Sequence, residues 1–550
     1  MGKQVFHTGG YAMLFTRRVV AASQVLAILG VFVCCAKPAG GSVSFTGDTQ
    51  VNTQLVIGNS TFGTFRIDGG STYATTSSSV VLGSQSTGVG IATITGAGSQ
   101  WTFANSSNGI DVGGAGYGRL EVLNGGVIFF TTTFGAGIDI ANSSGSQGTV
   151  VVDGAGSLVN AATLNVGIST SSGGTALLQI SNSAIVLATQ TSISTLGRVE
   201  LHNGQLRTGQ FGTNNGVITG AGEVVFSSTS SIMNNGRMEA SGGPLRFTGS
   251  NGSFQNNGVI AAEGSAIEFY RSISNVSIGG NAAEITLRNG VVRAGMLATS
   301  GAQLTNSGVL AAIGGTNDFY GRVTNVAAGN IAVTNHSVLI FHDDVTAEAG
   351  TITVFPGSSA VFLEDLTMSA GAILHANLAG TNQNTGFGDV EVVGVAQLEG
   401  SVQATLASGY TPHAGDTFPI VAASSITGTL ALGDMPALAA GLKWDLDRES
   451  NRVLLSVVPG LAGDYNSNGV VDSADYVVWR KTIAQTGNNL AADGDSNGTV
   501  DSADYDFWQS RFGNSSAGGA LVAAAVPEPG AALAFFAVLG LVMGCGRKLR

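Results

Sequence analysis

A repeat of short alternating segments with glycine at its corners constrains this chain more than any other feature. Five consecutive units share one plan, in which an apolar alternation, a Gly/Ser/Asn turn, a second alternation and a glycine-rich corner follow one another. The units read LVIGNSTFGTFRIDGGSTY, VVLGSQSTGVGIATITGAGSQW, IDVGGAGYGRLEVLNGGVI, IDIANSSGSQGTVVVDGAGSLV and LNVGISTSSGGTALLQISNSAIV. Their marker residues, spaced 25 to 30 residues apart, are Gly58, Gly83, Gly113, Ala141 and Gly167. Looser units continue around MNNGRMEA, QNNGVIAA and LTNSGVLAA.

This pattern predicts a mainly β fold. Alternation of apolar and polar residues indicates strands with one buried face. A fixed period with glycine corners indicates a solenoid, in which each turn buries its apolar face against its neighbours. We therefore predict a right-handed parallel β-helix over residues 42–370, followed by a β-rich cap domain over residues 371–458; the handedness rests on precedent. A series of β-sandwiches is the alternative fold, and the corner spacing argues against it.

The composition agrees with this fold and excludes several classes of function. Gly accounts for 82 of 550 residues and charged residues for only 11%, which argues against a helical enzyme because Gly is costly inside helices. Lys is absent between Lys37 and Lys443, so that stretch has no basic patch for nucleic acid. The three cysteines, Cys34, Cys35 and Cys545, lie in apolar segments at the chain ends, which excludes a disulfide framework or a cysteine nucleophile between them.

Two acidic loops near the C-terminus carry the pattern of calcium ligands. The first, Asp464 to Asp475, reads DYNSNGVVDSAD, and the second, Asp493 to Asp504, reads DGDSNGTVDSAD. Oxygen-bearing side chains occupy positions 1, 3, 5, 9 and 12, a glycine permits the turn at position 6, and position 7 offers its backbone carbonyl, as in EF-hand-type loops. The sequence thus predicts two bound Ca²⁺ ions. The predicted ligands are Asp464, Asn466, Asn468, Val470, Asp472 and Asp475 in the first loop, and Asp493, Asp495, Asn497, Thr499, Asp501 and Asp504 in the second.

Aromatic residues follow both loops in the same register. Tyr476 and Trp479 after the first loop correspond to Tyr505 and Trp508 after the second, 29 residues later. Residues three apart lie on one face of a helix, so each loop is expected to lead into a short helix that packs through this face. Both loops end in Asp rather than the Glu usual at position 12, and no clear helical pattern precedes either of them.

This arrangement resembles a type I dockerin module over residues 459–515. The resemblance implies a small α-helical module that folds around two Ca²⁺ ions and binds a cohesin domain. In that family, loop positions 10 and 11 help to choose the partner. Here they are Ser473 and Ala474 in the first loop and Ser502 and Ala503 in the second. A calcium-stabilised small domain without a partner is the alternative.

The start of the chain carries the features of a secretory signal peptide. Arg17 and Arg18 precede an apolar run that ends at Cys35, and small residues follow it. This order predicts a signal peptide over residues 1–36 and export of the protein. An uncleaved membrane anchor is the alternative, but the strictly apolar core is short for a membrane span.

The end of the chain, residues 516–550, is predicted to hold a linker and a sorting signal. The motif Val-Pro-Glu-Pro, Val526 to Pro529, precedes an apolar run, and basic residues end the chain. These basic residues should hold that end on the cytoplasmic side of a membrane. The order resembles the PEP-CTERM signal of exported bacterial proteins and implies a transmembrane helix, recognition by an exosortase-type processing enzyme and removal of the tail. A plain C-terminal anchor is the alternative, and both place the body outside the inner membrane. The residues of this signal are Val526, Pro527, Glu528, Pro529, Arg547, Lys548 and Arg550.

The repeats resemble autotransporter passenger domains and related bacterial surface proteins. The resemblance rests on GAGS corners at Gly96–Ser99 and Gly154–Ser157 and on an NGG corner at Asn124–Gly126. The segment Val390 to Val421 resembles the region that closes such β-helices. These resemblances imply a non-catalytic, secreted protein of the cell surface with a structural or adhesive role, and make an extracellular polysaccharide a candidate partner.

A polysaccharide lyase or glycoside hydrolase that a dockerin carries into an extracellular assembly is the alternative function, because parallel β-helices also include such enzymes. Hydrolysis of glycosides needs paired carboxylates, and the candidates are Asp343 and Asp344 beside His342, and Asp318 near Tyr320. Adjacent Asp residues on a strand point to opposite faces, and a solvated turn is the expected place of Asp343 and Asp344, so we predict no catalytic residue. Solubilising charge on the outer face is expected from Arg271, Arg288 and Arg293, and a strip on one solenoid face that contacts acidic sugars is the alternative.

Overall fold

The computed structural model describes residues 40–515 except 52–53, 77–78, 105–108, 132–134, 136, 168–173, 228–231, 250–252, 279–282, 297–302, 440, 488–489 and 496. The predicted signal peptide (1–36) and the predicted linker and sorting signal (516–550) lie outside the described residues. Within the described ranges, no helix is both long and apolar enough to cross a membrane.

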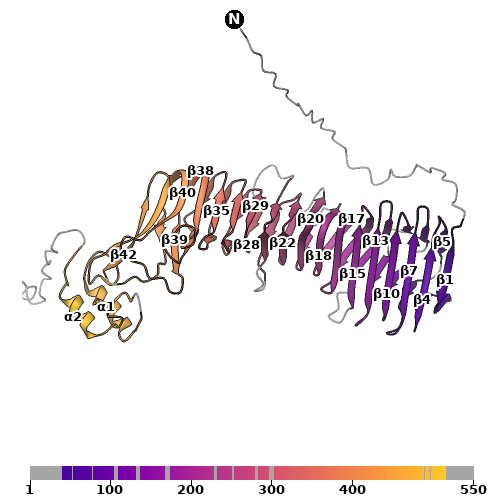
Figure 1. The fold of residues 1–550 in the computed structure, drawn as a ribbon, viewed down its shortest axis with the longest axis horizontal. Helices are drawn as coiled ribbons and strands as arrows, with labels where there is room; N and C mark the ends of the chain where they lie inside the picture. Colours follow the sequence, from indigo (N-terminus) through magenta and orange to yellow (C-terminus); the bar gives the residue numbers. More distant parts are fainter. Residues whose placement is uncertain are drawn as a thin grey trace, which may run out of the picture.

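The described chain is mainly β, and its strands stack side by side along one long axis (Figure 1). All 43 strands in the described ranges belong to one hydrogen-bonded network, and almost all pairs are parallel. Most strands pair with strands one turn earlier and one turn later in the chain, and three strands make one turn wherever no strand bends around a corner, so the pairing is that of a solenoid with three faces. The prediction of a mainly β fold with a long parallel sheet is confirmed.

Strands of the first face carry the longest ladder. They are β4 (Phe62–Ile67), β7 (Val89–Thr95), β10 (Tyr117–Leu123), β13 (Gln147–Asp153), β15 (Thr175–Ser181), β22 (Val259–Glu263), β25 (Glu284–Arg288), β28 (Val309–Ile313), β31 (Asn330–Thr334), β34 (Thr351–Val354), β37 (Ile373–Leu378), β39 (Ser401–Leu406) and β41 (Ala431–Leu432).

The other two faces are built from shorter strands. The second face contains β5 (Thr72–Thr75), β8 (Gln100–Phe103), β11 (Val127–Phe130), β23 (Ala266–Phe269), β26 (Val291–Arg293), β29 (Thr316–Tyr320), β32 (Val338–Phe341) and β35 (Ser359–Phe362). The third contains β3 (Leu55–Ile57), β6 (Val80–Leu82), β9 (Ile110–Val112), β12 (Gly137–Ile140), β19 (Ile232–Asn234), β21 (Phe254–Asn256), β24 (Ile273–Asn275), β27 (Leu304–Asn306), β30 (Val323–Asn325), β33 (Val345–Ala347) and β36 (Leu366–Met368).

Several long strands bend around a corner and contribute to more than one face. They are β14 (Leu158–Val166), β16 (Ile185–Ile193), β17 (Gly197–Asn214), β18 (Val217–Phe226), β20 (Arg237–Gly249), β38 (Asp389–Leu398) and β40 (Thr417–Thr427). Antiparallel strands close the two ends of the ladder: β1 (Val43–Gly47) and β2 (Thr49–Val51) at the start, and β42 (Leu442–Arg448) with β43 (Arg452–Pro459) at the finish.

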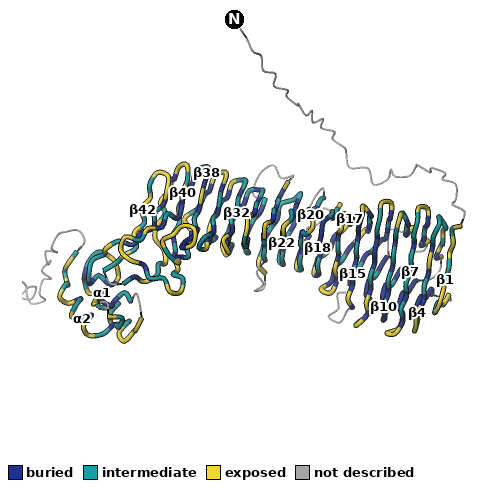
Figure 2. The backbone as a smooth tube through the Cα atoms, viewed as in Figure 1, coloured by how far each residue is buried: buried dark blue, intermediate teal, exposed yellow. Residues whose placement is uncertain are grey.

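The core runs through the inside of the solenoid as a continuous column. In β10, Leu120 and Val122 are fully buried between partly exposed neighbours, as alternation requires. Figure 2 shows this burial repeated along the strands, with exposed segments gathered at the corners. Because the turns pair in register, identical side chains come to lie on one another. Phe341 stacks on Phe362 with ring centroids 4.9 Å apart.

The marker glycines of the repeat lie where the backbone turns a corner. Gly58, Gly83 and Gly113 have φ values of 69°, 68° and 79°, a region that side chains disfavour. A Cβ atom at Gly83 would lie 2.2 Å from the carbonyl oxygen of Tyr117 on the next turn. The corners therefore need glycine both for the backbone conformation and for the close approach of the next turn.

A buried asparagine ladder that the sequence pattern did not predict lines another corner. Five of its six amide nitrogens donate to the amide oxygen on the next turn at 2.7 to 2.8 Å, the last donates to backbone carbonyls, and all six side chains are fully buried. Stacked amides of this kind satisfy polar groups that would otherwise be costly to bury. The ladder comprises Asn214, Asn234, Asn256, Asn275, Asn306 and Asn325.

The parallel ladder continues past residue 370, where the sequence analysis placed the start of the cap. β37 pairs with β39, β38 with β40 and β39 with β41, all in parallel. Antiparallel pairing begins only where β43 meets β40, and the β42–β43 hairpin completes it. The glycine corners become irregular near residue 370, but parallel pairing depends on the alternation of buried residues, which persists in β37 to β39.

Candidate calcium-binding site

The two acidic loops belong to a small module that follows β43. Its helices, α1 (Ser473–Thr482) and α2 (Ser502–Gln509), lie beside the last turns of the solenoid (Figure 1). The module has its own apolar cluster, separate from the solenoid core. The buried members are Tyr465, Val471, Ala492, Val500 and Trp508. The expectation that each loop leads into a short helix is confirmed.

An aspartate of each loop caps the helix that follows. The Asp472 carboxylate accepts a hydrogen bond from the Ala474 amide at 2.7 Å, and the Asp475 carboxylate accepts one from the Asp472 amide at 2.8 Å. Asp501 and Asp504 form the same capping box on α2, with the same two distances. Such reciprocal caps satisfy amide groups that a helix start leaves free. Positions 9 and 12 of each loop therefore fix the helix start.

In the first loop, the side chains at positions 1, 3 and 12 accept backbone amides of the same loop. The two oxygens of Asp464 accept from the Asn468 amide at 3.1 Å and the Gly469 amide at 2.7 Å. Asp475 accepts from the Asn466 amide at 3.0 Å. Asn466 itself accepts from the Asn468 amide at 2.9 Å. The chain is thus wrapped around its own carboxylates.

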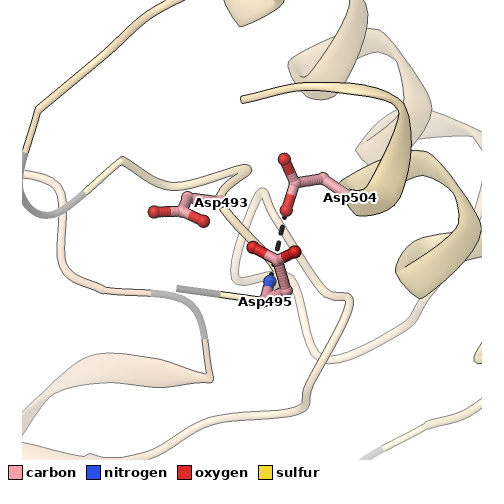
Figure 3. A group of neighbouring side chains, drawn as sticks. All are labelled: Asp493, Asp495 and Asp504. Carbon is pink, nitrogen blue, oxygen red and sulfur yellow. Dashed lines mark hydrogen bonds between the residues drawn. The ribbon is translucent and has the colours of Figure 1, made fainter. Parts of the chain in front are cut away.

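The second loop repeats these contacts one for one. Asp493 accepts from the Asn497 amide at 3.0 Å and the Gly498 amide at 2.8 Å. Asp504 accepts from the Asp495 amide at 3.2 Å. One carboxylate oxygen from each of Asp493, Asp495 and Asp504 lies within 4.8 Å of the other two (Figure 3). The structure therefore brings positions 1, 3 and 12 of this loop together.

The remaining predicted ligands sit at the edges of the loops. The amides of Val470 and Thr499 at position 7 are bonded to the side chains of Asn468 and Asn497, at 2.9 and 2.8 Å. Both position-7 residues also form isolated β-bridges, to Ser515 and Thr486 respectively.

The charge at the centre of the loops is not balanced by the protein. Asp475 and Asp504 are fully buried and Asp493 is nearly so. Among the residues that the structure describes, no Lys, Arg or His forms an ion pair with a loop carboxylate. Burial raises the pKa of Asp475 and Asp493, although backbone amides that donate to them act in the opposite direction. Buried charge of this kind needs a compensating partner.

The donor set fits a hard divalent cation. Every side chain that turns into the loops offers oxygen, either carboxylate or amide, and Ca²⁺ takes six to eight oxygen ligands in flexible geometry. The first loop has amides at positions 3 and 5 where the second has a carboxylate at position 3. The second loop therefore concentrates more negative charge.

Four aromatic rings join the two halves of the module. The Trp479 indole donates to the backbone carbonyl of Asp501 at 2.7 Å, and the Trp508 indole donates to that of Asp472 at 3.0 Å. Each tryptophan thus bonds to the N-cap residue of the opposite helix. With Tyr476 and Tyr505 they line a surface pocket of about 360 Å³. The predicted aromatic face is confirmed, but these cross-helix bonds have no counterpart in the sequence pattern.

The residues predicted to select a partner are exposed. Ser473, Ala474, Ser502 and Ala503 form the first turns of α1 and α2, at equivalent places in the two halves of the module. They are free to meet another surface.

The carboxylates singled out in the solenoid do not form a pair. Asp343 and Asp344 lie in a corner between β32 and β33, as the expected turn requires. Asp343 accepts from the Gly321 amide on the preceding turn at 2.8 Å, and Asp344 accepts from the Asp365 amide on the following turn at 3.4 Å. The two carboxylates therefore accept hydrogen bonds from turns on opposite sides of their own.

His342 has a partner of its own in the same region. Its ring bonds to Asp318 at 2.7 Å and stacks on Tyr320 at 3.8 Å.

Arg271, Arg288 and Arg293 do not form a strip on one strand face. Arg288 ends β25 on the first face, whereas Arg293 ends β26 on the second, where it pairs with Glu268 at 3.3 Å. Arg271 lies outside these strands and donates to the Gly249 carbonyl. Arg288 is separated from Arg293 because one turn of the solenoid carries them on different faces, and Arg271 lies on the preceding turn, where its carbonyl accepts from the Gly295 amide at 3.0 Å.

No protein-family model matches this chain, and the comparison with curated proteins gives no significant match.

Proposed function

We propose that residues 459–515 form a dockerin-like module with two Ca²⁺ ions, and that the chain is a non-catalytic protein of the cell surface. The observation that supports this proposal most strongly is the repeated loop. Two segments 29 residues apart make the same hydrogen bonds around buried carboxylates that have no cationic partner within the described residues. A bound cation at each loop resolves this imbalance.

In the proposed module, each loop holds one ion through the side chains at positions 1, 3, 5, 9 and 12. Bound Ca²⁺ supplies positive charge that links these oxygens. The chain's own contribution is to orient them: backbone amides hold Asp464 and Asp493, and the capping boxes hold Asp475 and Asp504. The calcium sites and the helix starts therefore form together.

The exposed first turns of α1 and α2 are the proposed docking surface for a cohesin-like domain. Their equivalence in the two halves suits a partner that binds either half in turn. The proposed role of the solenoid is a rigid stalk or adhesive surface, which a closed parallel ladder supports because each turn is fixed by its neighbours. The proposal also includes features that rest on the resemblance of the chain ends to a signal peptide and a PEP-CTERM signal. These features are a C-terminal transmembrane helix, processing by an exosortase-type enzyme, and a secreted, envelope-exposed location.

Calcium titration of the full chain by calorimetry tests the module. We expect two ions per chain, and one ion after Asp475→Asn or Asp504→Asn. Asp506→Asn is the matched control, because Asp506 is an exposed residue of α2 outside the loop. Binding of fewer than two ions by the unaltered chain, or an equal loss in the control, would refute the two-site assignment.

A capture experiment distinguishes docking from simple stabilisation. The full chain, immobilised in Ca²⁺, should retain an envelope protein that chelator releases, and substitution of both Ser473 and Ser502 by bulky residues should abolish retention. Two bound ions without any captured partner would favour a structural envelope protein in which Ca²⁺ only stabilises the module. Release of unsaturated or reducing sugars from a polysaccharide panel would favour the enzyme instead.

A further inference from the structure

A second, exposed column of asparagines runs beside the buried ladder. Asn215, Asn235 and Asn257 each follow a buried asparagine and precede a glycine, so the triplet Asn-Asn-Gly recurs on three successive turns. The Asn235 amide donates to the Asn215 oxygen at 3.0 Å, and the Asn257 amide donates to the Asn235 oxygen at 3.0 Å. The column is partly or fully exposed, unlike its buried neighbour.

This column lines an open groove of about 550 Å³ along the corner. The glycines of the triplets let the turns approach closely, since a Cβ at Gly236 would lie 2.0 Å from the Gly216 carbonyl oxygen. The amides consequently repeat at the spacing of neighbouring strands, about 4.8 Å. The lining residues are Thr195, Asn215, Gly216, Val217, Asn235, Gly236, Arg237, Asn257, Gly258 and Val259.

The exposed amides keep unused hydrogen-bonding capacity. A primary amide offers two N–H donors and an oxygen with two lone pairs, and the ladder uses at most one donor and one lone pair of each residue. The groove therefore presents donors and acceptors in a fixed register. The buried ladder beneath holds this register in place, which lowers the entropic cost of binding.

The charge in the groove selects among ligands. Arg237 is the single charged lining residue, and its guanidinium is already paired with Glu239 at 2.7 Å. An anionic ligand would find no free cation there, whereas a ligand with many hydroxyl groups would find matching donors and acceptors. Hydroxyl groups recur along an extended glycan at a spacing similar to that of the solenoid turns.

We propose that this groove binds an uncharged linear glycan that lies along the solenoid axis, with one sugar beside each turn. The inference deepens the proposed surface role of the protein and rests on it for its biological meaning, but the binding itself does not involve calcium. The lining residues from Thr195 to Asn257 span three turn spacings, or about 14 Å. Affinity should therefore rise with oligosaccharide length up to about four sugars and then level off.

Affinity electrophoresis of the full chain tests the proposal, with linear β-1,4-glucan, mannan and xylan as neutral probes and polygalacturonate as the anionic probe. We expect retardation by at least one neutral glycan, equal in Ca²⁺ and in chelator. Equal retardation in both conditions separates this result from any failure of the calcium module. For the glycan that binds, calorimetry with oligosaccharides of increasing length should show the plateau.

Substitutions then locate the site. Asn235→Ala, in the middle of the column, should weaken binding at least about tenfold, which corresponds to one well-placed pair of hydrogen bonds. Asn377→Ala is the matched control, because Asn377 is an outer-face amide on β37 that bonds Thr405 at 3.1 Å. Melting curves of both variants show whether the fold persists. Absence of binding to all neutral probes, equal loss in both variants, or preference for polygalacturonate would overturn the proposal.

Discussion

Replacement of Asp504 by Asn should destabilise the C-terminal module in calcium and leave its stability nearly unchanged in chelator. Asp504 is fully buried and its two oxygens accept three backbone amides, from Gly494, Asp495 and Asp501. Asparagine keeps one of these oxygens. Its amide nitrogen replaces the other and faces the Asp501 amide as a second donor, so one hydrogen bond of the capping box is lost.

The magnitude follows from two opposing effects. Loss of the capping hydrogen bond costs about 1 to 2 kcal/mol in either condition. In chelator, removal of one of three neighbouring carboxylates relieves repulsion of similar size, so the net change should be near zero or slightly stabilising. In calcium, loss of a charged ligand forfeits most of the binding contribution, about 2.7 kcal/mol at a free ion concentration 100 times the Kd. The variant should then be about 2 to 3 kcal/mol less stable than the unaltered chain, because the two ion-free forms have nearly the same stability.

Denaturant unfolding followed by tryptophan fluorescence measures this difference, because Trp479 and Trp508 both lie in the module. Asp506→Asn serves as the matched control and should change stability by less than about 0.5 kcal/mol in both conditions. If Asp504→Asn destabilised the module equally in calcium and in chelator, the carboxylate would be structural only, and the calcium assignment of this loop would be wrong.

Three further predictions concern the solenoid. Burial, aided by a nearby aspartate on the next turn, raises the pKa of Asp111 to about 6. Because the folded state keeps this proton to a higher pH than the unfolded state, the free energy of unfolding falls as pH rises from about 4 to about 6. Asp111→Asn should remove this loss and raise the free energy of unfolding at pH 7.5 by about 1 to 2 kcal/mol after allowance for partial exposure. Asn256→Ala should cost about 2 to 4 kcal/mol because it leaves buried ladder partners unsatisfied, whereas Asn257→Ala on the exposed column should cost less than about 1 kcal/mol; urea unfolding of the two variants compares them. Gly83→Ala should lower the free energy of unfolding more than Gly145→Ala does, by at least about 2 kcal/mol. Both glycines have positive φ, but only a Cβ at Gly83 would meet a neighbouring carbonyl oxygen. Equal melting temperatures of the two variants would contradict this reasoning.

Much of the architecture could be predicted because its determinants are local. Apolar alternation and the conformation of Gly58, Gly83 and Gly113 are written in short segments, and they suffice to predict parallel turns. The two acidic loops could be located for the same reason: the oxygen-bearing positions of each fall within twelve residues. The helices that follow were predicted from aromatic spacing alone.

Features that depend on the pairing of distant turns could not be predicted. The ladder from Asn214 to Asn325 requires the register of six turns, although the repeated Asn-Asn-Gly and Asn-Ser-Gly triplets were a visible signal. Separation of Arg288 from Arg293 required knowledge of where each corner lies. The end of the parallel ladder was missed because the glycine corners fade before the alternation does.

The two acidic loops are tied to one another more closely than their separation in sequence suggests. Trp508, which follows the second loop, bonds to the carbonyl of Asp472 in the first, and Trp479 bonds to the carbonyl of Asp501 in the second. The Tyr465 hydroxyl of the first loop also bonds to the carbonyl of Asp504 at 2.7 Å. Side chains from each half of the module therefore hold the backbone at position 9 or 12 of the opposite loop. An ion that binds one loop should reduce the ordering cost for the second ion, so calcium should bind with positive cooperativity, and the two halves of the module should unfold in a single step.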